Sequence, residues 1–350
     1  MTRYISLFPN NDKSYLKNGI FDIKKNNGRE VQIFARLKKF LKQTGIDINT
    51  FDIYKGNPEK YIYIDLPYPT ISNISVWKTI FLNRKKNILI CVEPPMILPI
   101  NYMKFFHNFF SKIYTWNDQL VDKKKYFKIL LPKSIYKSKI RSKKFKNKKF
   151  LVLINSNKSL FYPVKLIKSF GRELYSERIK AIEFFEKNIP DRFYLYGVGW
   201  NIPKRYNFKE LILGSKKYKT YKGTIDNKLE LLSGFKYCLC FENLTDTKGF
   251  ITEKIFDCFK AKCIPIYWGA SDIEKYIPKN CFIDFRDFKD YDKLVDYLDL
   301  INETTYNRYI KNIEKLLSNK KFINTWFEEG FAHFFLENIL EFRDNEKHTK

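Results

Sequence analysis

Short apolar runs alternate with helical patterns along most of this 350-residue chain, and that alternation is the strongest constraint on its fold. Four runs in the first 130 residues are typical of strands, "YIYIDLPYP", "NILICVEPP", "SKIYTWN" and "YFKILLP". Ahead of them, "REVQIFARLKKFLKQTG" places Val31, Phe34, Leu37 and Leu41 near one helical face, with Gly45 as the expected stop. Such alternation predicts a mostly parallel sheet covered by helices.

A second alternating set follows residue 150. Strands are predicted at "FLVLINSN", "RFYLYG", "YCLCFEN", "CIPIYWG" and "CFIDF", and helices at about 173–188, near 226–234 and from Thr252. The rest of the chain has helical patterns to about residue 343 and then a charged tail. The basic stretch 133–150 has little hydrophobic period, which favours a solvated linker between two domains.

The two sets together predict an α/β protein with two Rossmann-like domains and C-terminal helices. We predict an N-terminal domain over 1–135, a linker over 136–150, a C-terminal domain over 151–325, and a terminal helix and tail over 326–350 that pack back toward the first domain. Ligands in open sheets of this kind bind beyond the carboxyl ends of the strands. Functional residues are therefore expected just after strands.

Composition restricts the class of protein further. Lysine and arginine number 65 against 38 acidic residues, a net charge of +27 that would favour polyanions, although a basic coding bias spread over the surface is the simpler interpretation. The six cysteines form no C-x-x-C pair, which indicates reduced core residues, and the three histidines are too far apart to suggest a metal site. No apolar run approaches the ~20 residues of a membrane span, and no signal peptide is visible, so we expect an intracellular, cytoplasmic protein. Peripheral contact with an anionic membrane is left open.

Glu93 is the first candidate for chemistry. It directly follows the run "NILICV" and precedes two prolines, so its carboxylate should lie at the carboxyl end of a strand on a stiffened backbone. The position suits a general base, and it equally suits an ordinary exposed glutamate in a turn.

The second candidate for chemistry is the junction between a predicted strand and a predicted helix at "FENLTDTKGFITEK". Thr252 is expected to cap a helix that carries Glu253 and Lys254 in its first turn, beside unpaired backbone N–H groups. A glutamate is common there, but a lysine is mildly unfavourable unless something negative lies nearby. The helix start and the ammonium together therefore predict a bound anion.

Arg178 and Lys180 lie on the predicted helix after "FLVLINSN". Arginine can bind a phosphate through two parallel hydrogen bonds, but a solvated helix face opposite Ile179, Ile182 and Phe185 is the simpler interpretation.

The segment "FENLTDTKGFITEKIFDCFKAKCIPIYWGASDIEKYIPKNCFIDFRDF" resembles the signature of glycosyltransferase family 10, the α-1,3/1,4-fucosyltransferases. In that family F-E-N, a short loop, an aromatic-[VI]-T-E-K segment, an apolar helix and P-[IV]-x-x-G follow in this order. Weaker similarity extends over about residues 85–290. The resemblance implies a GT-B fold, two Rossmann-like domains facing each other across a cleft, with GDP-fucose bound mainly by the C-terminal one.

The resemblance also implies roles for individual residues. Glu93 matches the carboxylate regarded as the base in an inverting transfer of L-fucose from GDP-β-L-fucose to a glycan or glycoconjugate hydroxyl. Arg178 and Lys254 would contact the departing diphosphate. Phe250 and Asn243 would lie beside the nucleotide and in the same pocket, and Glu253 would bind donor hydroxyls.

Two departures and two alternatives remain. Phe250 stands where tyrosine is usual, and the loop "LTDTKG" is slightly longer than in compact relatives. No tightly bound cofactor is expected; Mn²⁺, which often stimulates the family, would do no more than stimulate. A different GDP-sugar donor, or a basic nucleic-acid-binding protein on a degenerate transferase core, are the competing hypotheses.

Overall fold

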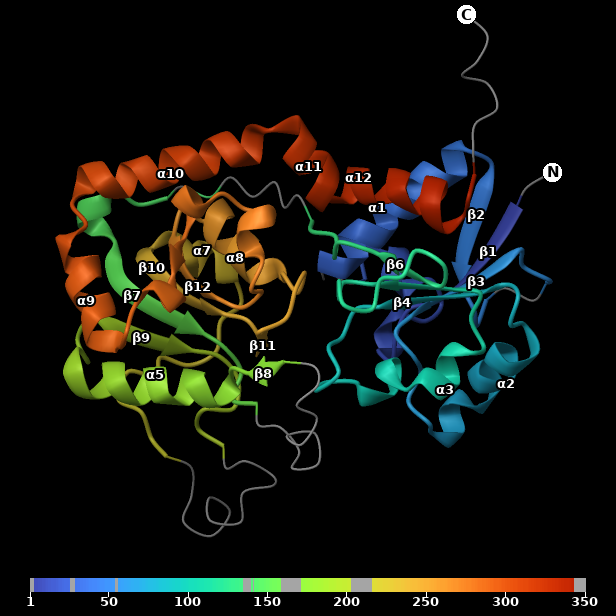
Figure 1. The fold of residues 1–350 in the computed structure, drawn as a ribbon, viewed down its shortest axis with the longest axis horizontal. Coiled ribbons are helices and arrows are strands. Elements are labelled where there is room, and N and C mark those ends of the chain that lie inside the picture. Colours follow the sequence, from blue (N-terminus) through green and yellow to red (C-terminus); the bar gives the residue numbers. More distant parts are fainter. Residues whose placement is uncertain are drawn as a thin grey trace, which may run out of the picture. The chain divides into compact units, whose positions relative to one another are not determined.

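Two compact units make up the chain in a computed structural model, which describes residues 3–25, 29–53, 56–134, 140, 142–158, 171–202 and 216–342. The first unit comprises Met1–Lys137 with Lys320–Lys350, and the second comprises Ser138–Asn319 (Figure 1). Each unit contains one parallel sheet.

The first unit is built on a sheet of six parallel strands in the order β2-β1-β3-β4-β5-β6. The strands are β1 (Arg3–Phe8), β2 (Ile46–Thr50), β3 (Lys60–Ile64), β4 (Asn87–Cys91), β5 (Lys112–Thr115) and β6 (Tyr126–Lys128). Central β4 is buried at all five positions, as expected for a strand with both faces covered. The four strands predicted from the sequence are thus confirmed, whereas β1 and β2 were not predicted.

One face of this sheet is covered by α1 (Arg29–Gln43) together with α12 (Glu328–Phe334) and the π-helical turn Phe335–Ile339, and α11 (Lys320–Trp326) packs against α12. The predicted face of α1 is confirmed, because Val31, Phe34, Leu37 and Leu41 are all buried. Phe34 meets Phe331 edge to face at 6.1 Å, which joins two segments almost 300 residues apart in one core. Gly45 lies between the end of α1 and the start of β2, and its φ of 76° is in the left-handed region that favours glycine.

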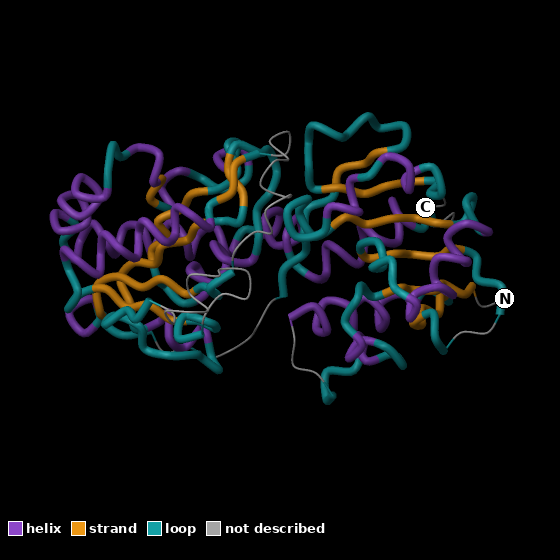
Figure 2. The backbone as a smooth tube through the Cα atoms, turned by 90° about the horizontal axis from the view of Figure 1, so that it is seen from below, coloured by secondary structure: helices purple, strands orange, loops and turns teal. Residues whose placement is uncertain are grey.

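The opposite face carries α2 (Ile74–Leu82) and the short α3 (Lys104–His107). Figure 2 shows the strands of this unit running side by side with helices beside them. Buried Val76 and Ile80 of α2 join a second core with Leu89 and Cys91 of β4.

The second unit has a five-stranded parallel sheet in the order β13-β12-β10-β7-β9. Its strands are β7 (Lys149–Ile154), β9 (Phe193–Tyr196), β10 (Phe235–Phe241), β12 (Ile264–Trp268) and β13 (Ile283–Asp284). The helices are α5 (Tyr175–Asn188), α7 (Lys228–Ser233), α8 (Glu253–Lys260), α9 (Tyr291–Leu300) and α10 (Glu303–Ser318). A small antiparallel pair, β8 (Arg172–Glu173) with β11 (Leu244–Thr245), was not predicted.

The basic stretch 133–150 departs from the expected solvated linker. Lys148 is buried, and its Nζ donates to the carbonyl oxygens of Ser233, Phe235 and Lys262 at 2.6, 3.3 and 3.1 Å. Burial lowers the pKa of Lys148 to about 8, because the charged form loses its hydration. The end of the stretch therefore belongs to the second unit at the amino edge of its sheet.

The cysteines are confirmed as reduced core residues, since all six are free and buried. Among the described residues no helix is long and apolar enough to cross a bilayer.

Candidate active site

Buried polar groups gather at the carboxyl edge of the second sheet, where β10 ends at Phe241. The Nη2 of Arg178 donates to the carbonyl oxygens of Phe241 and Glu242 at 2.7 and 2.6 Å and to Oδ1 of Asn243 at 3.0 Å. The Asn155 amide, oriented to satisfy its neighbours, accepts from Nη1 and Nε of Arg178 at 2.6 and 3.0 Å. The guanidinium thus ties the ends of β7 and β10 to α5.

This position corrects the expectation for Arg178 on two counts. The side chain lies on the buried face of α5, at 2% exposure, while Ile179 is only half-buried. All three guanidinium nitrogens face protein acceptors, so direct contact with a diphosphate is not favoured by this geometry. Only Lys180 keeps the solvated position, where it pairs with Glu177 at 2.9 Å.

Glu242 is the functional candidate that the sequence analysis missed. Its carboxylate is fully buried and accepts from the amide N of Thr252 at 2.8 Å, from Thr252 Oγ1 at 2.6 Å and from Lys254 Nζ at 3.0 Å. A buried carboxylate needs this pairing, since an isolated buried charge is costly. The glutamate of F-E-N therefore fixes the start of α8. Its position directly after a predicted strand is the sequence feature that could have identified it as a candidate.

The start of α8 carries Glu253 and Lys254, as predicted. Thr252 is the N-cap residue, with φ −95° and ψ −172°, but its hydroxyl bonds to Glu242 and makes no capping bond. Lys254 Nζ also donates to Thr252 Oγ1 at 3.0 Å, and the side chain is 18% exposed. Glu242 thus supplies a negative charge that makes a first-turn lysine favourable, and the lysine side chain stays partly exposed.

Phe250 is buried in this structure. Its ring is 1% exposed, so it packs inside the unit and does not present a face to solvent. Asn243 and Glu253 are half-buried beside the strand end and the helix start. The structure therefore brings Arg178, Asn243 and Lys254 to one edge through their shared contacts with residues 241–243.

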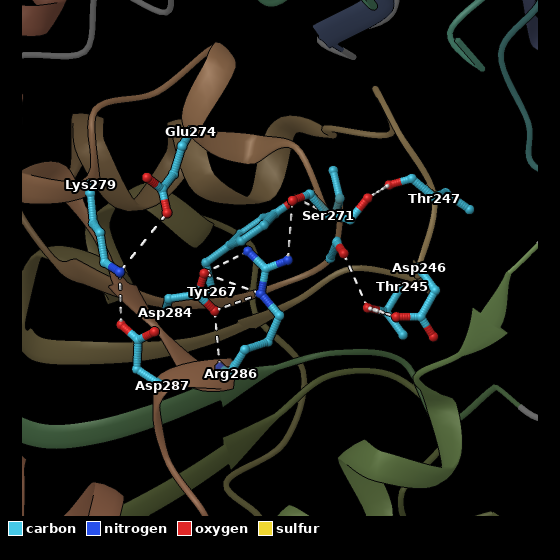
Figure 3. Close-up of polar contacts among 12 residues, drawn as sticks. Thr245, Asp246, Thr247, Tyr267, Ser271, Glu274, Lys279, Asp284, Arg286 and Asp287 are labelled. Atoms are coloured by element: carbon cyan, nitrogen blue, oxygen red, sulfur yellow. Dashed lines mark hydrogen bonds and ion pairs between the residues drawn. The ribbon is translucent and has the colours of Figure 1, made fainter. Parts of the chain in front are cut away.

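The next strand connection packs directly behind this edge. A Cβ built on Gly269 would lie 2.5 Å from Glu242 Cγ and 2.5 Å from Tyr267 Oη, so only glycine fits there. Thr245 Oγ1 donates to the Gly269 carbonyl at 3.1 Å, and the Ala270 N–H donates to Tyr267 Oη at 3.0 Å. Figure 3 shows these contacts around Tyr267.

An ion pair at the end of β13 stabilises the region next to Tyr267. Arg286 Nε donates to both carboxylate oxygens of Asp284 at 2.9 and 3.1 Å, and Asp284 is buried (Figure 3). The contact with Asp284 raises the pKa of Arg286. A rigid base of this kind reduces the reorganisation needed when a ligand binds.

In the first unit, Glu93 follows β4 at the carboxyl edge and is half-buried. Its backbone is fixed at both ends, because its N–H donates to Asp65 Oδ1 at 3.1 Å and its carbonyl accepts from Tyr102 Oη at 3.0 Å. This geometry favours a positioned carboxylate over an ordinary exposed turn.

Asp65, directly after β3, is a second buried carboxylate at this edge. It accepts from the Val92 N–H at 2.7 Å and from Asn101 Nδ2 at 2.5 Å, and its φ of 61° lies in the left-handed region. Burial, opposed by these hydrogen bonds and aided by the nearby charge of Glu93, raises the pKa of Asp65 to about 7. The structure thus places a proton-holding group beneath the loop of Glu93.

The raised pKa of Asp65 predicts a pH-dependent stability. Between about pH 4 and pH 7 the folded chain keeps a proton that the unfolded chain has lost, so the free energy of unfolding falls as pH rises through that window. The window corresponds to about 4 kcal/mol for this group. Urea unfolding of the wild type and of Asp65→Asn at half-unit steps should show this fall only in the wild type. Parallel curves for the two proteins would contradict the assignment.

No group of three or more His, Cys, Asp or Glu side chains within the described residues is arranged to hold a metal ion. Asp290, the first acidic residue of the D-x-D sequence at 290–292, accepts from the Lys293 N–H at 2.9 Å as the N-cap of α9.

Comparison with known proteins supports the resemblance in the second unit. The profile described as "Glycosyltransferase family 10 (fucosyltransferase) C-term" matches residues 212–331. An α-(1,3)-fucosyltransferase of Helicobacter pylori is 35% identical over 140 residues, which are 38% of this chain and 29% of that protein. The mouse 4-galactosyl-N-acetylglucosaminide 3-α-L-fucosyltransferase 9 is 38% identical over 74 residues, 21% of this chain and 20% of that protein. The matched part thus spans under a third of either relative.

Solved structures extend the likeness to the whole fold. A crystal structure of an α-1,3-fucosyltransferase aligns with a TM-score of 0.54 at 19% identity, covering 100% of this chain and 92% of that one. At that identity the match establishes the architecture alone, the GT-B type of two Rossmann-like units. The F-E-N and T-E-K residues thus assemble around one strand end, within the segment 212–331 that is similar to the C-terminal part of glycosyltransferase family 10.

Proposed function

We propose that the protein is an inverting fucosyltransferase, which moves L-fucose from GDP-β-L-fucose to a hydroxyl of a glycan or glycoconjugate. The observation that carries the proposal is the partly exposed side chain of Lys254 at the start of α8, held by buried Glu242. A helix start with a lysine beside it suits a diphosphate, because both favour negative charge. The match of residues 212–331 to the family 10 profile, and the α-1,3-fucosyltransferase names of similar proteins, support fucose as the donor sugar.

In this proposal Lys254 and the N–H groups of α8 stabilise the departing diphosphate, and Glu93 takes the proton from the acceptor hydroxyl. The bond from the hydroxyl oxygen to the anomeric carbon forms as the bond to the diphosphate breaks, with inversion at that carbon. No covalent nucleophile is needed. Electrostatic stabilisation of developing charge is the larger contribution expected here.

Arg178 acts in this scheme as a positioning residue. Its contacts with Phe241, Glu242 and Asn243 hold the strand end from which the site is built. Asn243 and Glu253, half-buried at that edge, are proposed to contact the donor. Phe250 is proposed to support the nucleotide site by packing, since its ring is buried. Stimulation by Mn²⁺ is a proposal that rests on the diphosphate alone, through partial neutralisation of its charge.

The donor preference can be tested by ligand stabilisation and turnover. GDP at about 100 times its dissociation constant should add about 2.7 kcal/mol to the stability of the second unit, whereas UDP and CMP should add little. GDP-fucose should then be consumed in preference to GDP-mannose. Equal stabilisation by all three nucleotides would contradict a guanine-specific site, and preference for GDP-mannose would replace fucose as the sugar.

A further inference from the structure

The face of α2 and α3 that points away from the sheet is apolar where a surface helix is normally polar. Val76, Trp77 and Ile80 occupy the buried side of α2, yet Ile74, Phe81 and Leu82 on its other side are 60%, 46% and 71% exposed. A helix that is apolar on both sides is normally covered on both.

Neighbouring segments extend this face. Ile71, just before α2, is 87% exposed, and Met103 and Phe105 at α3 are 52% and 64% exposed. Aromatic contacts join the two helices, because Trp77 lies 4.9 Å from Phe106 and the ring of Phe81 lies 4.7 Å from that of Phe109. We call this surface the α2–α3 face; its exposed members are Ile71, Ile74, Phe81, Leu82, Met103 and Phe105. Figure 1 shows α2 and α3 next to each other.

The α2–α3 face includes a hollow lined almost entirely by apolar groups. Its volume is about 670 Å³, and Ile71, Ile74, Trp77, Phe81, Leu82 and Phe106 line most of it. Contiguous exposed apolar surface of this kind on a soluble domain marks an interaction site.

The charges around the face decide among partners. Residues 66–111 contain Lys78, Arg84, Lys85, Lys86 and Lys104 against one acidic residue, Glu93. Lys78 also lines the hollow, and Lys104 immediately precedes Phe105. Lys125 lies near Arg84, and the acidic Asp122 lies beside Lys125 as well. An apolar face surrounded by ammonium groups is complementary to a surface with an apolar interior and anionic headgroups.

We propose that the α2–α3 face docks on an anionic lipid bilayer, with Ile71, Leu82 and Phe105 entering the acyl boundary and the lysines contacting the headgroups. Interfacial binding of this kind grows with the apolar area buried and with attraction to anionic lipid. Lysine stems can lie along the apolar surface while their ammonium groups reach the phosphates. The inference is independent of the proposed transferase activity, because it rests on a surface of the first unit alone.

The test is binding of the full chain to vesicles. The wild type should sediment with vesicles of equal parts phosphatidylcholine and phosphatidylglycerol, and much less with phosphatidylcholine alone. The combined change Ile71→Ser, Leu82→Ser and Phe105→Ser should weaken binding by about tenfold or more. These side chains are mostly exposed, so folding should be retained; Leu300→Ser, at an 81% exposed position of the second unit, is the matched control and should bind as the wild type does.

A charge pair separates local docking from the overall positive charge. Lys78→Glu with Lys85→Glu should reduce binding about tenfold, while Lys311→Glu with Lys315→Glu on α10 changes net charge equally and should have little effect. Equal losses in both pairs, or a wild type that does not bind anionic vesicles, would overturn the proposal. Lipid-free dimers of the wild type that the serine variant abolishes would assign the face to a second copy of the chain instead.

Discussion

Glu93→Gln is expected to lower kcat for fucosyl transfer by about 10²- to 10⁴-fold, the usual contribution of a positioned general base. The amide keeps the shape of the side chain but cannot take the acceptor proton. The backbone contacts of Glu93 with Asp65 and Tyr102 do not involve the side chain, so the loop should stay in place. Stopped assays of transfer at saturating GDP-fucose would give kcat directly.

A control for this variant exists at the opposite edge of the same sheet. Glu59 lies just before β3 and forms an ion pair with Arg3. It carries the same functional group far from the carboxyl ends of the strands. Glu59→Gln should retain kcat, and stabilisation by GDP should be unchanged in both variants. Full transfer by Glu93→Gln would remove the base assignment, and loss of GDP stabilisation would show that the substitution damages more than proton transfer.

Lys254→Ala should reduce kcat/KM by about 10²- to 10³-fold, because one electrostatic contact with developing charge is typically worth about 3 to 4 kcal/mol. It should also abolish most of the stabilisation by GDP. Lys254→Arg keeps the charge and should restore part of both effects. Isothermal titration with GDP alongside steady-state kinetics would measure the two together.

Removing Lys254 also leaves Glu242 with fewer partners, so a stability control is needed. Lys148 provides one, since it is a buried lysine that holds carbonyl oxygens at the amino end of the same strand, β10. Lys148→Ala should lower stability while the folded fraction keeps its kcat and its affinity for GDP. If Lys254→Ala behaves like Lys148→Ala, the lysine is structural and the diphosphate lies elsewhere.

The strands that could be predicted are those with continuous apolar runs. β3, β4, β5, β10 and β12 are mostly or fully buried, and their sequences are mainly aliphatic and aromatic residues with cysteine. β2, "IDINT", was missed because Asp and Asn are depleted in strands and only alternate positions are buried. β1, "RYISLF", begins with a charged residue and a polar interruption that weakened the same signal.

The site could be located from the sequence but not assembled. The rule that ligands bind beyond strand ends directed attention to Glu93 and to the start of α8, and the structure places Glu93 just after β4 and Lys254 beside the end of β10. The partnership of Arg178 with residues 63 to 65 positions away depends on tertiary packing, and helical periodicity favoured a solvated face because buried arginine is rare. The same holds for Asp65, whose raised pKa follows from burial that no local pattern reveals.

The central claim is that this chain transfers fucose from a GDP-linked donor held at the start of α8. Its most direct test is a glycan array treated with the wild-type protein and labelled GDP-fucose, with released GDP measured in parallel. We expect labelled fucoside on a defined set of glycans and one GDP released per fucose transferred. Absence of both transfer and GDP release, in a folded protein whose thermal stability GDP leaves unchanged, would contradict it.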